Sequence, residues 1–137
     1  MDLAIENGSL KAVSQHRLLI ESDTREQIAF GADCVNGYAG PVLAMSERRL
    51  RDNAQKFKSA MPRVRPHFAV KANPDADILR IFNEEGCCFE IASSAELQAM
   101  IDLGVDLETV FYSNPIKSPV SIRDAAKAGI QWYVVDT

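Results

Sequence analysis

Cysteine is scarce in this sequence, and the few cysteines form no pattern that binds metal or crosslinks a fold. Cys34, Cys87 and Cys88 make an odd number and include no Cys-x-x-Cys spacing. Two adjacent cysteines have poor geometry for a structural disulfide or for two ligands of one zinc ion. Because Cys87 and Cys88 begin an apolar run, we expect buried thiols on a strand. The two histidines, His16 and His67, lie far apart without a carboxylate–histidine motif, so the sequence predicts no metal site.

Excess positive charge and long apolar runs are also missing. The formal net charge is −4 and there is no basic run, which argues against nucleic acid as a partner. No stretch approaches the roughly 18 apolar residues that a membrane span needs. Residues 1–6 lack the basic region and apolar run of a secretory signal. These absences predict a cytoplasmic chain that binds neither nucleic acid nor membrane.

The composition is that of a chain that builds a hydrophobic core. Hydrophobic residues make up 47% and charged residues 25% of 137 residues, a length within the range of one ordinary domain. Residues 1–40 predict only short or irregular structure. Residues 41–45 resemble a strand, and a helix is expected over 47–60 with Ser46 as its N-cap. Leu50, Ala54 and Phe57 would form the apolar stripe of that helix.

From Pro66 onward the sequence alternates regularly between strand-like and helical patterns. Strands are expected at residues 68–71, 88–92, 110–113 and 132–136. Helices are expected at about 75–85, from the Ser93 cap to Gly104, and from Pro119 to Gly129 behind a Ser118 cap. This rhythm with short loops predicts right-handed strand–helix–strand units and a parallel sheet.

Periodicity alone leaves two architectures open, an open doubly wound sheet and a (β/α)8 barrel. No GxGxxG or GxxxxGK[ST] motif follows any strand, so there is no dinucleotide or Walker phosphate loop. Both architectures place functional groups where strands end, and Lys71, Glu90 and Ser113-Asn114 are the polar residues there.

Lys71 is the chemically conspicuous residue of the series, because it closes the apolar run 68–70. A desolvated lysine amine loses its proton readily and can form Schiff bases with carbonyl compounds. The alternative is a lysine at a strand end whose ammonium reaches into water. The stretch itself does not decide between these two interpretations.

Four ordered motifs resemble one known family. Phe68-Ala69-Val70-Lys71-Ala72-Asn73 is similar to the cofactor-lysine motif of the alanine-racemase-fold pyridoxal-phosphate enzymes, the ornithine/diaminopimelate/arginine decarboxylases. The other matching segments are 86–93 with Glu96-Leu97 behind it, 112–117, and Gly129 with the strand 134–136. The Ser-Asn-Pro-Ile-Lys segment is most like the ornithine (lysine/ornithine) decarboxylase branch.

The resemblance implies an α/β fold that is part of a (β/α)8 TIM barrel. Residues 63–137 would supply the first four strand–helix units of the barrel that binds pyridoxal phosphate. Residues 1–62 would be an N-terminal segment that belongs to a β-domain. A complete barrel of this kind has about 250 residues, so the chain is expected to be the N-terminal part of a longer enzyme.

The resemblance assigns roles to two residues. Lys71 would be the catalytic lysine that holds pyridoxal phosphate covalently. Glu90 lies where the family commonly has an aspartate near the cofactor, and a glutamate side chain is one methylene longer. The alternative is that the Glu90 carboxylate only pairs with a neighbouring residue at the strand end. Glu96 matches a family acid too, but a capping box with Ser93 explains it without chemistry. Lys117 is expected to be a solvated loop charge.

The implied function is decarboxylation of a basic, ornithine-like amino acid to a polyamine precursor by a homodimer. The 137-residue chain alone is expected to be inactive, because the later phosphate loop and second-subunit groups are not in it. Two alternatives stay open: an amino-acid racemase of the same fold, and a non-catalytic relative that binds pyridoxal phosphate or a partner protein.

Overall fold

The computed structural model describes residues 10–14, 17–20 and 43–136. The chain divides into two compact units, Met1–Asn53 and Ala54–Thr137. None of the described helices is long and apolar enough to cross a membrane. The assignment of residues 1–62 to a β-domain stays a prediction.

The first unit contains a three-stranded sheet. Its strands are β1 (Leu10–Ser14), β2 (Arg17–Ile20) and β3 (Leu43–Ser46). β1 pairs with β2 antiparallel, and β2 pairs with β3 in parallel. β1 and β2 are short, as expected for the residues before Pro41. β3 corresponds to the strand predicted at 41–45, and residues 41–42 of that prediction lie outside the described residues.

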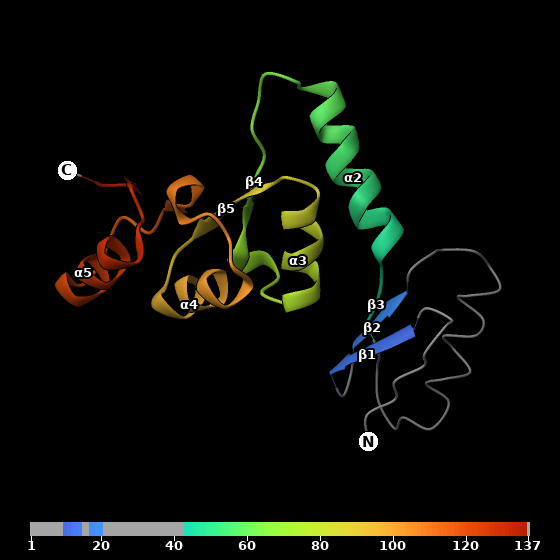
Figure 1. Cartoon of the computed structure of the whole chain (residues 1–137), viewed down its shortest axis with the longest axis horizontal. Helices are drawn as coiled ribbons and strands as arrows, with labels where there is room; N and C mark the ends of the chain where they lie inside the picture. The colour runs from blue at the N-terminus through green and yellow to red at the C-terminus, as the bar shows by residue number, and fades with distance from the viewer. Residues whose placement is uncertain (1–9, 15–16, 21–42, 137) are drawn as a thin grey trace. The chain divides into compact units, whose positions relative to one another are not determined.

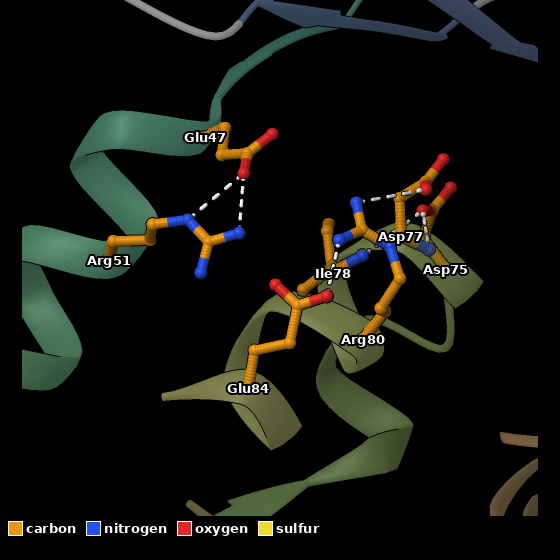
Figure 2. Close-up of polar contacts among 7 residues, drawn as sticks. All are labelled: Glu47, Arg51, Asp75, Asp77, Ile78, Arg80 and Glu84. Atoms are coloured by element: carbon orange, nitrogen blue, oxygen red, sulfur yellow. Dashed lines mark hydrogen bonds and ion pairs between the residues drawn. The ribbon is translucent and has the colours of Figure 1, made fainter. Parts of the chain in front are cut away.

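Helix α2 (Glu47–Ala60) has the predicted bounds and the predicted cap. The backbone N–H of Arg49 donates to Ser46 Oγ at 3.3 Å. Within the first turns Arg51 Nε donates to Glu47 Oε1 at 2.9 Å (Figure 2). Of the expected apolar stripe, Ala54 is buried, whereas Phe57 remains 37% exposed.

The second unit is built on a parallel sheet of four strands. In spatial order they are β4 (His67–Ala69), β5 (Cys88–Ile91), β6 (Phe111–Tyr112) and β7 (Trp132–Tyr133). Every neighbouring pair is parallel, which confirms the α/β prediction. The strands are shorter than predicted, because 132–136 pairs only over its first two residues and 68–71 ends at Ala69.

Three helices connect these strands and follow one another from yellow-green to red in Figure 1. They are α3 (Ala76–Glu84), α4 (Ser94–Leu103) and α5 (Pro119–Ala128). Two 3-10 turns lie between elements, η1 (Val70–Ala72) and η2 (Leu107–Thr109). Sequence order equals spatial order in the sheet, as expected for successive strand–helix–strand units.

Helix α3 is stabilised by polar contacts within its own sequence. The Asp75 carboxylate caps it by accepting the N–H groups of Asp77 at 3.0 Å and Ile78 at 3.4 Å. Figure 2 shows Arg80 between two acids, with Nη2 3.4 Å from Asp77 Oδ1 and Nη1 2.7 Å from Glu84 Oε1. These contacts raise the pKa of the guanidinium, chiefly through the Glu84 hydrogen bond.

Helices α4 and α5 begin and end where their capping residues predict. Ser93 Oγ accepts the N–H of Glu96 at 3.2 Å, and Ser118 Oγ accepts that of Ser121 at 3.1 Å. Both helices end on a glycine in the left-handed region, Gly104 with φ 70° and Gly129 with φ 110°. A side chain there would be strained, so these glycines stop the helices.

The two faces of the sheet differ in composition. One face contributes Phe89, Ile91 and Tyr112 to a core completed by residues of the three helices, among them Leu79, Leu97, Met100 and Ala125. Strand residues alternate between faces, so Glu90 and Phe111 lie on the other side. We call the set His67, Glu90, Phe111 and Trp132 the open face; its Phe111 and Trp132 remain 36% and 56% exposed.

The Ser93 cap provides a direct stability test. Ser93→Ala is expected to lower the free energy of unfolding by about 1 kcal/mol, because the first turn of α4 loses an acceptor for a backbone N–H. Ser94→Ala is the matched control: its exposed hydroxyl makes only a 3.4 Å contact with Ser121, and alanine favours helix. Chemical denaturation of the full-length protein measures both. Equal destabilisation by the two substitutions would contradict the capping assignment.

Candidate functional site

Lys71 lies in a 3-10 turn and not at the end of a strand. Pairing with β5 stops at the Ala69–Glu90 pair, after which the N–H of Asn73 donates to the Val70 carbonyl at 3.1 Å and closes the turn. The strand predicted through Lys71 is therefore wrong for its last two residues. Val70 is fully buried and the Lys71 side chain is exposed, so the turn presents the amine outward.

The candidate acid Glu90 lies on an inner strand of the sheet, near the C-terminal end of that strand. It lies on β5, paired with Ala69 on one side and Phe111 on the other, and its side chain is half-buried. Ser113 Oγ donates to Glu90 Oε1 at 2.6 Å. The neighbour that engages this carboxylate is thus a hydroxyl, and among the described residues no cation forms an ion pair with it.

These groups gather at the C-terminal edge of the parallel sheet. Lys71 follows Ala69 by two residues, and Ala69 is the pairing partner of Glu90. Ser113 and Asn114 come directly after β6, the next strand. Asn114 Nδ2 donates to the Ala92 carbonyl at 3.2 Å, which ties the loop after β6 to the end of β5.

A row of aromatic rings crosses the open face. His67 stacks on Phe111 with ring centroids 4.2 Å apart and planes 15° apart, and Phe111 lies 5.9 Å from Trp132. The sequence interpretation assigned no role to any of these rings. The spacing between successive strands could have predicted this row, because aligning the strands pairs Phe111 with Trp132.

Glu96 is a capping residue in this structure. Its carboxylate accepts the N–H of Ala92 at 2.8 Å and the hydroxyl of Ser93 at 3.1 Å. The reciprocal capping contact therefore reaches one residue further back than in the standard box, where the cap's own N–H is the donor. These contacts use both carboxylate oxygens.

Lys117 is tied to a backbone group and is not the freely solvated charge that was expected. Its Nζ donates to the Val134 carbonyl at 2.6 Å and lies 5.5 Å from the centroid of the Tyr112 ring. This contact joins the loop after β6 to the end of β7. It is a structural contact between neighbouring strand ends.

The cysteines of this region are buried thiols. Cys88 lies in β5 and Cys87 precedes it, and both are free. Burial raises the pKa of the Cys87 thiol, more than the nearby Lys58 ammonium lowers it. Cys34 lies outside the described residues. In the part of the chain that is described, no group of three or more ligating side chains could hold a metal ion.

Comparison with known proteins places this geometry in a family. Residues 47–137 match the pyridoxal binding domain of pyridoxal-dependent decarboxylases. The chain is 30% identical over 132 residues to the chloroplastic ornithine decarboxylase of Nicotiana glauca, covering 85% of this chain and 30% of that relative. It is 40% identical over 81 residues to antizyme inhibitor 2 of Xenopus laevis, covering 59% and 18%.

A solved structure gives the same picture for the fold. The lysine/ornithine decarboxylase of Vibrio vulnificus, complexed with putrescine, superposes with a TM-score of 0.76 at 28% identity. The match covers 85% of this chain and 32% of that one. The chain thus corresponds to the N-terminal part of a TIM-barrel decarboxylase, as the partial-barrel prediction stated. It spans about a third of the length of these decarboxylases.

The raised pKa of Cys87 predicts slow alkylation. At about pH 8.5 a free thiol is roughly half ionised, and only the thiolate reacts. Cys87 should react with iodoacetamide more slowly in the native protein than in the urea-unfolded protein, and the native rate should keep rising at higher pH. Mass spectrometry of the peptide that contains Cys87 measures the rate. An equal rate in both states would contradict a buried, poorly ionised thiol.

Proposed function

This chain belongs to the family of pyridoxal-dependent decarboxylases, and we propose that it contributes the cofactor-binding lysine of a pyridoxal-phosphate site. The observation that carries this proposal is the exposed amine of Lys71, presented at the C-terminal edge of the parallel sheet within the matched region. The C-terminal edge is where barrels of this class hold their functional groups.

The side chains at this edge suit the chemistry of the cofactor. An exposed primary amine such as that of Lys71 can react with the aldehyde of pyridoxal phosphate. Glu90 adds a carboxylate near the same edge, and a carboxylate accepts hydrogen bonds from protonated polar groups. Lys71 would hold the cofactor, and Glu90 would orient it.

We propose a basic amino acid of the ornithine type as the substrate of the whole protein. The relatives support this, since they are named ornithine and lysine/ornithine decarboxylases, and the solved structure of one contains putrescine. Bound pyridoxal phosphate supplies an electron sink for the pair left on the α-carbon when carbon dioxide departs. The protein's part is to bind and orient the amino acid and to control its protons.

The remainder of the active site is proposed to come from sequence beyond this region. The chain corresponds to about a third of the decarboxylases that it matches. We propose that the 137-residue chain alone does not turn over substrate, and that the full-length protein acts as a homodimer that makes a polyamine precursor.

Borohydride trapping tests the role of Lys71. The full-length protein is incubated with pyridoxal phosphate, reduced, digested and mapped by mass spectrometry. The cofactor should be found on the peptide that contains Lys71, because reduction converts the covalent linkage to a stable amine. Lys71→Arg should abolish this label.

The matched control for that experiment is Lys127→Arg. Lys127 is another exposed lysine, in the last turn of α5. Its replacement should leave the label on Lys71 unchanged. The cofactor is kept limiting, because an excess labels exposed amines non-specifically, whereas at limiting cofactor most of the label should be on the site lysine. Preferential labelling of a different lysine would refute the assignment of Lys71.

Measurement of carbon dioxide separates the candidate reactions. Full-length protein loaded with cofactor is expected to release carbon dioxide from L-ornithine, and the 137-residue chain is expected to release none. Loss of optical rotation without carbon dioxide would indicate a racemase instead. Measurable turnover by the 137-residue chain would contradict its proposed dependence on the rest of the protein.

A second candidate function rests on one relative. The antizyme inhibitor 2 of Xenopus laevis shares 40% identity over 81 residues, and its name describes an inhibitor and not a decarboxylase. A non-catalytic relative that acts by binding a partner protein is therefore the alternative. Cofactor loading without release of carbon dioxide by the full-length protein would favour it.

A further inference from the structure

The Glu90 carboxylate is engaged at one oxygen only. Ser113 Oγ donates to Glu90 Oε1 at 2.6 Å, a short distance typical of a hydroxyl bonded to a charged carboxylate. Within the described part of the chain, the other oxygen, Oε2, has no hydrogen-bond partner. The carboxylate is thus held at one end and has acceptor capacity at the other.

The hydroxyl of Ser113 is itself held by the strand that carries Glu90. The backbone N–H of Ser113 donates to the Ile91 carbonyl at 2.8 Å, which extends the β5–β6 pairing beyond the last residue of β6. The Asn114 amide then donates to the Ala92 carbonyl at 3.2 Å. These two bonds hold the backbone around residue 113 in place. Ser113 Oγ also lies 3.3 Å from the Ile91 carbonyl, a second acceptor for its single proton, and the shorter distance of 2.6 Å makes the Glu90 carboxylate the main acceptor.

Glutamate needs such a restraint more than a shorter acid does. Its side chain has one more rotatable bond than aspartate, and holding it in one conformation costs conformational entropy. Glu90 is half-buried, and no described cation pairs with it to select a rotamer. A hydroxyl at 2.6 Å selects one arrangement without cancelling the negative charge.

We propose that Ser113 is a positioning residue of the cofactor site: its hydroxyl orients the Glu90 carboxylate so that Oε2 is directed to a polar group of bound pyridoxal phosphate. This inference rests on the proposed function, in which Lys71 holds the cofactor and Glu90 orients it. Ser113 does not touch the cofactor and acts only through Glu90. The backbone anchor of residue 113 does not need the hydroxyl, so the side chain can be changed alone.

Cofactor affinity of the full-length protein tests this proposal. Titration with pyridoxal phosphate, followed by absorbance, gives the dissociation constant of each variant. Ser113→Ala is expected to weaken binding roughly ten- to a hundredfold, the size of one lost hydrogen bond to a charged group. Ser113→Thr keeps the hydroxyl and should bind like the wild type, and Ser113→Cys, a weak donor, should fall between them.

Three further measurements separate positioning from a merely structural role. In a Glu90→Gln background, Ser113→Ala should have little further effect on affinity, because the two residues act through one contact. Ser121→Ala is the matched control; it removes a serine hydroxyl of α5, which contacts the capping residue Ser118, and should leave affinity unchanged. Thermal unfolding of the cofactor-free variants shows whether each has folded. If Ser113→Ala does not fold, the affinities of Ser113→Cys and Ser113→Thr test the proposal in its place.

Each outcome supports or overturns the inference. Wild-type affinity in Ser113→Ala, with trapping on Lys71 intact, would overturn the role of Ser113 and leave the proposed function standing. An equal loss from Ser113→Ala in the wild-type and Glu90→Gln backgrounds would overturn the route through Glu90. Failure of the wild-type protein to bind pyridoxal phosphate at all would overturn the proposed function, and this inference with it.

Discussion

The parallel pairing of β5 with its two neighbours is the constraint on which the candidate site depends. It sets Glu90 beside Ala69 on one side and beside Phe111 on the other. Since all four strands of this sheet run the same way, the residues that follow them lie at the same end of the sheet. The turn of Lys71 after β4 and the loop of Ser113 after β6 therefore lie at that end, one on each side of β5. A shift of one residue would move Glu90 to the other face of the sheet and separate it from Ser113.

The asymmetry of the sheet separates the hydrophobic core from the candidate site. The helices bury Phe89, Ile91 and Tyr112 on one face, and the chemistry-bearing groups lie on or beside the other. Core residues and the candidate site residue therefore alternate along β5, and Glu90 lies between the buried Phe89 and Ile91.

Much of the fold followed from local sequence signals, because they act within one turn of a helix. Ser93 and Ser118 begin helices α4 and α5, and Gly104 and Gly129 end them where the pattern predicted. The strand predicted through Lys71 failed for a non-local reason. Whether a residue stays in a strand depends on its pairing partner, and pairing of β4 stops at Ala69.

The sequence by itself determined the alternation of strands and helices and the family resemblance. Tertiary structure alone decided which groups meet. Glu90 and Ser113 are 23 residues apart in the chain, and their 2.6 Å contact exists only because β5 and β6 are adjacent and in register. Lys117 likewise donates to the carbonyl of Val134, the residue that follows β7, 17 residues away in the chain. Contacts of this kind depend on the pairing of distant strands, which local propensity and spacing do not encode.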